Sequence, residues 1–78
     1  MKEQILNCLN DPKNGEANRK LLAFCKEPTT FAEMEKRAGV KGDLLKVLVA
    51  LKNAEGIAWV DGKYYSTPLG LEVLASLQ

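Results

Sequence analysis

The side chains best suited to acid–base or nucleophilic chemistry are few in this sequence, and their spacing does not bring them together. The chain has no histidine, so the most common general base of enzymes is absent. Glu33 and Glu35 are two residues apart in a segment that we predict to be helical, and side chains at that spacing do not face each other. Ser66 and Ser76 have no evident base partner, and no glycine-rich phosphate loop is present. We therefore expect neither enzymatic activity nor a cofactor.

The two cysteines, Cys8 and Cys25, do not form a Cys-x-x-Cys pair. Because no histidine can complete a zinc site, we expect no bound metal. Each cysteine lies beside apolar neighbours in a predicted helix, where free cysteine is commonly a small buried residue. We interpret both as buried thiols in a reducing compartment, and a disulfide is the alternative.

The composition is that of one small globular domain. The chain has 78 residues, of which 46% are hydrophobic and 27% are charged, so its core is marginal in size. No apolar run approaches the roughly 18 residues that cross a bilayer. The N-terminal segment is too polar for a signal peptide, so we expect a cytoplasmic protein. The net charge of +1 is a weak sign of nucleic-acid binding, which usually requires a strongly basic face.

Residues 29–56 predict two short helices joined by a tight turn. In the first helix, residues 31–38, either Thr29 or Thr30 is the expected N-cap, and Glu33 lies at the capping-box spacing from Thr30. Gly39 suits the left-handed residue that ends a helix. The second helix begins near Asp43, an expected cap or first-turn acid. Its apolar stripe consists of Leu44, Leu48 and Leu51. This combination is a helix-turn-helix.

Three more helices are expected around this pair. Two amphipathic helices precede it, over residues 2–9 and 16–26. Pro28 ends the second of them, because the residue before a proline avoids the helical region. The last helix, residues 67–77, opens with a Thr-Pro pair that suits an N-cap and the first helical position. We expect a single domain over residues 1–78.

The hydrophobic period changes from helical to two residues after Gly56, which predicts a hairpin over residues 57–66. The Asp61-Gly62 pair fits a two-residue type I′ turn. The resulting cross-strand pairs are Val60–Lys63, Trp59–Tyr64 and Ala58–Tyr65. One side of the sheet then carries Ile57, Trp59 and Tyr64, and we expect that side to face the core. The outer side carries Ala58, Val60, Lys63 and Tyr65.

A helix-turn-helix followed by such a hairpin resembles the winged-helix superfamily. The run FAEMEKRAGVKGDLLKVLVALKNAEGI is similar to the helix-turn-helix of archaeal and bacterial winged-helix regulators, and DGKYYSTPLGLEVL is similar to their wing and following helix. The runs LLKVLVAL and TPLG are also similar to the dimerisation domain of small-molecule O-methyltransferases. The catalytic domain of those enzymes has no counterpart here. Over residues 18–77 the resemblance implies a winged helix, which is α+β and mainly helical, with an extra N-terminal helix.

The resemblance implies a small transcriptional regulator that binds duplex DNA as a dimer, through the second helix of the pair. In DNA-binding members the second helix of the pair enters the major groove, and the wing touches the backbone or the minor groove. Residues 43–53 would be that helix. Lys41 and Lys46 would contact phosphate or guanine, and Asn53 a base edge or phosphate. The expected DNA contacts are Lys36, Arg37, Lys41, Lys46, Asn53, Lys63 and Tyr65.

Other interpretations of these charges remain open. Lys41 and Lys46 can equally be ordinary solvated lysines. Asp43 would repel phosphate near the groove, and Asp61 would do so at the wing tip. Three basic residues of the earlier helix, namely Arg19, Lys20 and Lys26, are further candidate phosphate contacts. Lys20 also lies one turn after Glu16, where it can serve helix pairing instead.

The first and last helices carry more apolar surface than one buried stripe requires. In winged-helix dimers the terminal helices commonly form the interface, so the resemblance implies a homodimer through Ile5, Leu9, Leu71, Leu74 and Leu77. The alternative is that these helices pack on each other within one chain. The second functional hypothesis is a protein-interaction or dimerisation module that does not touch DNA. An exposed apolar patch on the second helix of the pair would favour that module, and a continuous basic stripe would favour DNA.

Overall fold

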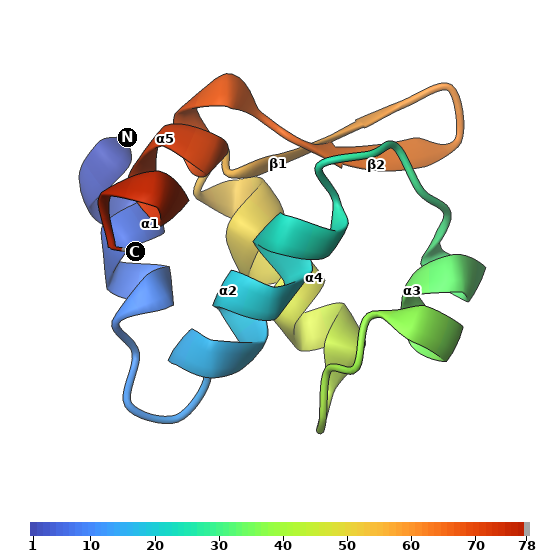
Figure 1. Ribbon diagram of the computed structural model, residues 1–78, viewed down its shortest axis with the longest axis horizontal. Coiled ribbons are helices and arrows are strands. Elements are labelled where there is room, and N and C mark those ends of the chain that lie inside the picture. Colours follow the sequence, from blue (N-terminus) through green and yellow to red (C-terminus); the bar gives the residue numbers. More distant parts are fainter. Residues whose placement is uncertain (78) are drawn as a thin grey trace.

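The computed structural model describes residues 1–77. This part of the chain forms an α+β, mainly helical fold of five helices and one two-stranded antiparallel hairpin (Figure 1). The elements are α1 (Lys2–Leu9), α2 (Gly15–Phe24), α3 (Phe31–Arg37), α4 (Leu44–Asn53), β1 (Ile57–Val60), β2 (Lys63–Ser66) and α5 (Pro68–Ser76). The predicted elements and their order are confirmed, with small differences at their ends. No helix within residues 1–77 has the length and apolar character needed to span a bilayer.

Side-chain caps determine where α3, α4 and α5 begin. Thr30, Asp43 and Thr67 each accept a hydrogen bond from the backbone N–H three residues later, at 3.2, 3.1 and 3.0 Å respectively. Each bond satisfies a donor that the first turn of a helix leaves free. Between α3 and α4, Gly39 and Gly42 have φ values of +68° and +92°, which glycine adopts without steric strain. The predicted caps and the left-handed Gly39 are therefore confirmed.

The hairpin has the predicted register. Val60 pairs with Lys63, Trp59 with Tyr64, and Ala58 with Tyr65. Asp61 and Gly62 both have positive φ, at 53° and 80°, as a type I′ turn requires.

The base of the hairpin is tied to the helices, whereas its tip extends away from α1, α4 and α5 on the side of the molecule where α3 lies (Figure 1). Thr29, which does not cap α3, instead exchanges two backbone hydrogen bonds with Tyr64, at 2.9 and 2.7 Å. Ser66 is buried, and its hydroxyl donates to the carbonyl of Leu22. The base of the sheet is therefore fixed by α2 and by the segment that precedes α3.

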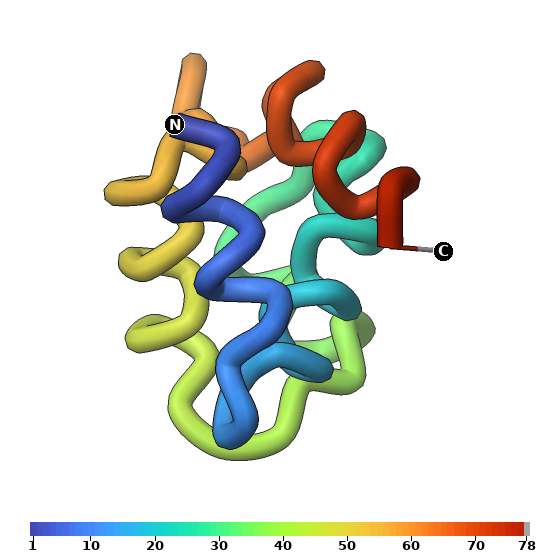
Figure 2. Tube along the Cα trace, turned by 90° about the vertical axis from the view of Figure 1, so that its left-hand side faces the viewer, coloured from blue at the N-terminus to red at the C-terminus, as the bar shows by residue number. Residues whose placement is uncertain are grey.

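The hydrophobic core lies where α1, α2, α4 and α5 meet. Figure 2 shows α1 between α4 and α5, and α1 packs against both of them as well as against α2. The largest fully buried side chains are Ile5, Leu9, Leu21, Leu22, Met34, Leu48, Leu51 and Cys25. Residues from both ends of the sequence therefore share one core with the central helices.

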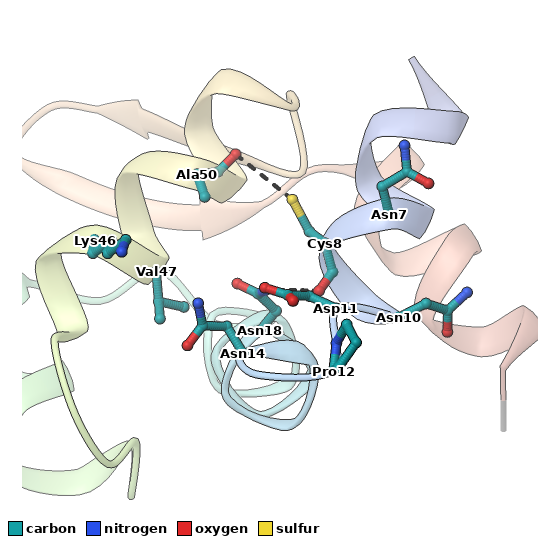
Figure 3. Close-up of a pocket in the computed structure, with 10 residues that line it drawn as sticks. All are labelled: Asn7, Cys8, Asn10, Asp11, Pro12, Asn14, Asn18, Lys46, Val47 and Ala50. Carbon is teal, nitrogen blue, oxygen red and sulfur yellow. Dashed lines mark hydrogen bonds between the residues drawn. The ribbon is translucent and has the colours of Figure 1, made fainter.

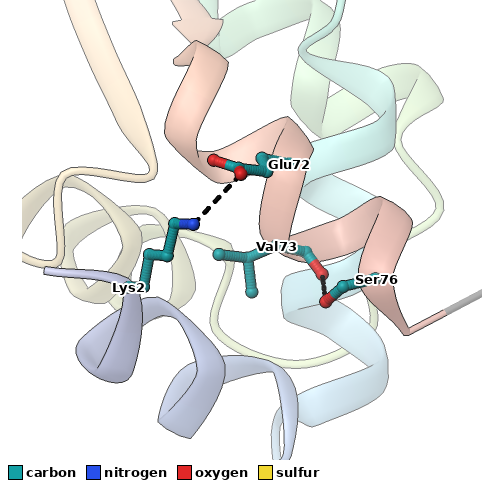
Figure 4. Close-up of polar contacts among 4 residues, drawn as sticks. All are labelled: Lys2, Glu72, Val73 and Ser76. Carbon is teal, nitrogen blue, oxygen red and sulfur yellow. Dashed lines mark hydrogen bonds and ion pairs between the residues drawn. The ribbon is translucent and has the colours of Figure 1, made fainter.

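The burial of the terminal helices corrects the predicted dimer interface. Ile5 and Leu9 are 0% and 1% exposed in the single chain, and Leu74 is also buried. These three side chains cannot contact a second folded copy, because α1 and α5 pack on each other and on α2. An ion pair of 3.0 Å between Lys2 and Glu72 joins the same two helices at the surface (Figure 4). Only Leu71 and Leu77 of the predicted interface stay partly exposed.

Cys8 and Cys25 are both free thiols, and Cys25 is buried, as predicted. Cys8 is only half-buried. Burial raises the pKa of the Cys25 thiol from 9.0 to about 11, because the interior disfavours the thiolate.

This pKa shift predicts a loss of stability at high pH. Between pH 9 and about 11, the unfolded chain releases the Cys25 proton before the folded chain does, so the free energy of unfolding falls as the pH rises. Below pH 9 both states keep this proton, and the thiol contributes no pH dependence. Urea unfolding of wild type and Cys25→Ala, at about pH 8 and about pH 10.5, checks this. The variant should lose less stability between the two pH values, and an equal loss would contradict the prediction.

Gly70 generates a second prediction. It lies in the first turn of α5, where an added Cβ would be 2.5 Å from the carbonyl oxygen of Gly56. At an open helical position, Gly→Ala stabilises by about 1 kcal/mol. Here we expect Gly70→Ala to destabilise by about 1–3 kcal/mol, because two backbone segments must move apart. Chemical unfolding monitored by circular dichroism measures the change, and a stabilised variant would show that the approach is looser than described.

Candidate nucleic-acid interface

Helix α4 has one buried face and one exposed face. Val47, Leu48 and Leu51 are buried, and Leu44 packs partly against the core. Leu48 and Leu51 were expected on this stripe, and Val47 also belongs to the core. The solvent-exposed residues of the helix are Leu45, Lys46, Val49, Ala50, Lys52 and Asn53. Packing on α2 therefore leaves the opposite side of α4 free to contact another molecule.

Three lysines gather near the N-terminal end of α4. Lys41 and Lys46 line a shallow depression of about 240 Å³ together with Lys13, which comes from the turn between α1 and α2. An adjoining depression of about 210 Å³ is bordered by Lys13, Lys41 and Lys20. The ion pairs within residues 1–77 are Lys2–Glu72, Lys20–Glu16 and Arg37–Glu33, so Lys13, Lys41 and Lys46 are unpaired in this part of the chain.

Lys13 was not among the expected DNA contacts. It lies in a run of turn-forming residues, and the sequence gives no sign that this turn reaches the beginning of α4. The charge of Lys13 joins those of Lys41 and Lys46 only because α1, α2 and α4 pack together.

Acidic side chains reduce the local positive charge. The Asp43 carboxylate accepts the Lys46 backbone N–H at 3.1 Å, so it serves as the helix cap beside the lysines. On α3, the Nε of Arg37 lies 3.3 Å from Glu33, at an exposed i,i+4 pair. Such pairs are weak and easily exchanged for another partner. Lys36 is exposed and has no ion pair among the described residues.

The exposed face of α4 also carries large apolar side chains. Leu45 is 57% exposed and Val49 is 45% exposed, one helical turn apart. The helical period places Leu45 at the edge of the stripe formed by Leu44, Leu48 and Leu51, and the structure exposes it to solvent. The exposed face is therefore mixed, with the apolar Leu45 and Val49 among the polar Lys46, Lys52 and Asn53.

The hairpin places Lys63 at the surface and leaves Tyr65 half-buried. Trp59 was expected in the core, and this prediction is wrong: its side chain is 53% exposed. Ile57 is buried at the base of the same strand, but the hairpin extends away from α1, α4 and α5 before it reaches Trp59. The indole instead contacts Tyr64 across the hairpin, with ring centroids 6.5 Å apart at an interplanar angle of 54°.

A larger depression of about 540 Å³ lies beside α4, between α1 and the α1–α2 turn (Figure 3). Its lining residues are Asn7, Cys8, Asn10, Asp11, Pro12, Asn14, Asn18, Lys46, Val47 and Ala50. The Cys8 thiol lies 4.0 Å from the Ala50 carbonyl, a weak contact between α1 and α4. Partial burial, with a smaller effect from the charge of Asp11, raises the pKa of Cys8 above its usual value. Lys46 therefore borders this depression as well as the lysine cluster.

Comparisons with protein-family models, curated proteins and solved structures found no match to this chain.

The exposed tryptophan generates a stability prediction. We expect Trp59→Ala to lower the free energy of unfolding by about 1–2 kcal/mol, because about half of this side chain is exposed and it packs on Tyr64 across the hairpin. The control Ile57→Ala, two residues earlier on the same side of the strand, should cost about 2–4 kcal/mol because Ile57 is buried. Urea unfolding monitored by circular dichroism measures both. Similar costs for the two variants would mean that Trp59 is part of the core after all.

Proposed function

We propose that this chain is a winged-helix domain that binds duplex DNA through α4, assisted by the β1–β2 hairpin. The order of elements supports the assignment, because α3 and α4 are followed directly by the antiparallel hairpin. The bridge between Thr29 and Tyr64 adds a short third segment beside β2, immediately before α3. With this bridge, the hairpin is held to the chain that enters the helix pair. It can then act as a wing beside α4.

The observation that carries the proposal is the group of unpaired lysines at the beginning of α4. Lys13, Lys41 and Lys46 come from two separate segments and border the same depression. Lysines that neutralise phosphates release condensed counterions, and this release supplies nearly all of the non-specific affinity of proteins for DNA. A net charge of +1 does not reveal this group of lysines, because charges of both signs are spread over the chain; Asp43 and Glu16 also line the two depressions and offset part of the positive charge there.

The remaining exposed residues would contact the bases and the backbone of the bound DNA. Lys46 and Asn53 carry groups that hydrogen-bond to base edges, whereas Leu45 and Val49 offer apolar contact to thymine methyl groups. Lys63 on the hairpin, with Lys36 and Arg37 on α3, would contact the backbone. Arg37 would exchange its surface pair with Glu33 for a phosphate. Tyr65 is half-buried, so it would contribute at most its hydroxyl edge.

A second candidate function rests on a specific observation. Leu45 and Val49 expose apolar surface in the first half of α4, where a DNA-reading helix more often carries polar groups. An exposed apolar pair on a helix that is otherwise free favours a protein-interaction module. The two functions differ in whether the lysines or the apolar pair dominates binding.

Salt-dependent DNA binding tests the proposal. We expect a fluorescently labelled random-sequence duplex to bind the wild type at low salt. The affinity should fall as salt is added. In the Lys41→Ala/Lys46→Ala variant, the slope of log K against log salt should be shallower by about 1.8, since each lost phosphate contact removes about 0.9. Fluorescence anisotropy at several salt concentrations gives both slopes.

Two control variants make the result specific. Lys41→Arg/Lys46→Arg keeps both charges and should retain the wild-type slope. Lys2→Ala removes a charge that is paired with Glu72 between α1 and α5, away from α4, and should also leave the slope unchanged. A Leu45→Ser/Val49→Ser variant should keep non-specific binding. Absence of wild-type binding at low salt would overturn the DNA proposal, and the interaction module would then take its place.

A further inference from the structure

The depression between α1, the α1–α2 turn and α4 has the size of a small-molecule site. Its volume of about 540 Å³ is within the range of about 300–1,000 Å³ typical of ligand pockets. Three separate elements border it, and it is open to solvent between them: α1 with the following turn lies on one side, α2 at its floor, and α4 on the other side (Figure 3).

The floor contains a buried polar atom that lacks a partner. Asn18 is 3% exposed, and its Nδ2 donates to the carbonyl of Cys8 at 2.7 Å. This bond fixes the orientation of the amide, because the reverse orientation would place two acceptor oxygens together. The Oδ1 atom is left without a hydrogen bond among residues 1–77. Buried acceptors normally receive a hydrogen bond, so we expect an N–H or O–H group of another molecule to donate to this oxygen.

Opposite charges stand on the two sides of the depression. Asp11 belongs to the turn, and one oxygen of its carboxylate accepts the Lys13 backbone N–H at 3.2 Å. Its other oxygen has no hydrogen bond within the described chain, so it adds a negative acceptor to the same lining. Lys46 borders the depression from α4 and has no ion pair there. The apolar part of the wall of the depression is formed by Pro12, Val47 and Ala50.

We propose that this depression binds a small zwitterion of the α-amino-acid type. The ligand ammonium group would donate to Asp11 and Asn18, and the ligand carboxylate would pair with Lys46. Its side chain would lie against Val47 and Ala50. Less than 1 Å² of the Asn18 oxygen is accessible in this structure, so its contact with the ligand ammonium requires a local side-chain movement, which is part of the proposal.

This site would also give the chain a regulatory input, a consequence that rests on the proposed DNA binding. Lys46 lies in the lining of both the depression and the lysine cluster. A ligand carboxylate paired with Lys46 would therefore compete with a DNA phosphate for the same ammonium group.

Binding of the twenty L-amino acids, added singly at millimolar concentration, tests the site without any DNA. We expect at least one of them to produce saturable amide shifts in ¹⁵N spectra at Cys8, Asn18 and Ala50. The N-acetylated amide of the same amino acid, which lacks both charges, should bind at least about tenfold more weakly, because it loses two charge-assisted contacts.

Matched variants locate the contacts. Asp11→Asn keeps the turn acceptor but removes the charge, and Lys46→Gln removes the ammonium. Each should weaken binding by about tenfold or more, whereas Lys41→Gln, a neighbouring lysine outside the depression, should not. The proposal is overturned if no amino acid shifts these residues, or if the three variants bind alike. Adding the bound amino acid to the DNA titration tests the competition separately. If the chain binds the amino acid but no DNA, the proposed DNA binding is refuted and the amino-acid site is not.

Discussion

The burial of one face of α4 is the constraint on which the rest of the structure depends. Val47, Leu48 and Leu51 fill the centre of a core that a chain of this length can form only once. Helices α1 and α2 pack against α4, and α5 closes the core from the side of α1 and α2. Because this packing fixes the rotation of α4, it also determines that Leu45, Lys46, Val49 and Asn53 face the solvent.

The hairpin is held by polar contacts at its base rather than by a core of its own. The Thr67 hydroxyl donates to the carbonyl of Glu55 at 2.8 Å and also accepts the Gly70 N–H, so one side chain joins the end of α4 to the start of α5. Gly70 permits the close approach of these segments. With its base fixed in this way, the hairpin extends away from α1, α4 and α5, and its tip has few neighbours to bury Trp59.

Charge in this protein is meaningful only when it is located in three dimensions. A net charge of +1 argues weakly for nucleic acid, yet the unpaired lysines gather where the α1–α2 turn meets the beginning of α4. The same meeting of elements creates the depression that holds Asn18 and Asp11. The proposed interface and the proposed ligand site thus have a common origin in the packing of α1 beside α4, and Lys46 belongs to both.

Local physical chemistry made the secondary structure predictable from the sequence. The capping residues Thr30, Asp43 and Thr67 bond within their own first turns, and the Asp61-Gly62 turn fixes the hairpin register, so these features depend on neighbours along the chain. The expected DNA contacts on α4 also face solvent, because the helical period alone separates the two faces.

Other features depend on distances between segments that are remote in sequence, and only the tertiary structure decided them. The apolar residues of α1 and α5 could serve either a dimer or a core, and the burial of Ile5, Leu9 and Leu74 shows that they complete the core. Trp59 has the correct alternation for burial, but no helix covers the hairpin at that position. Lys13 and Asn18 carry no local signal, since their surroundings arise only when α1, α2 and α4 pack together.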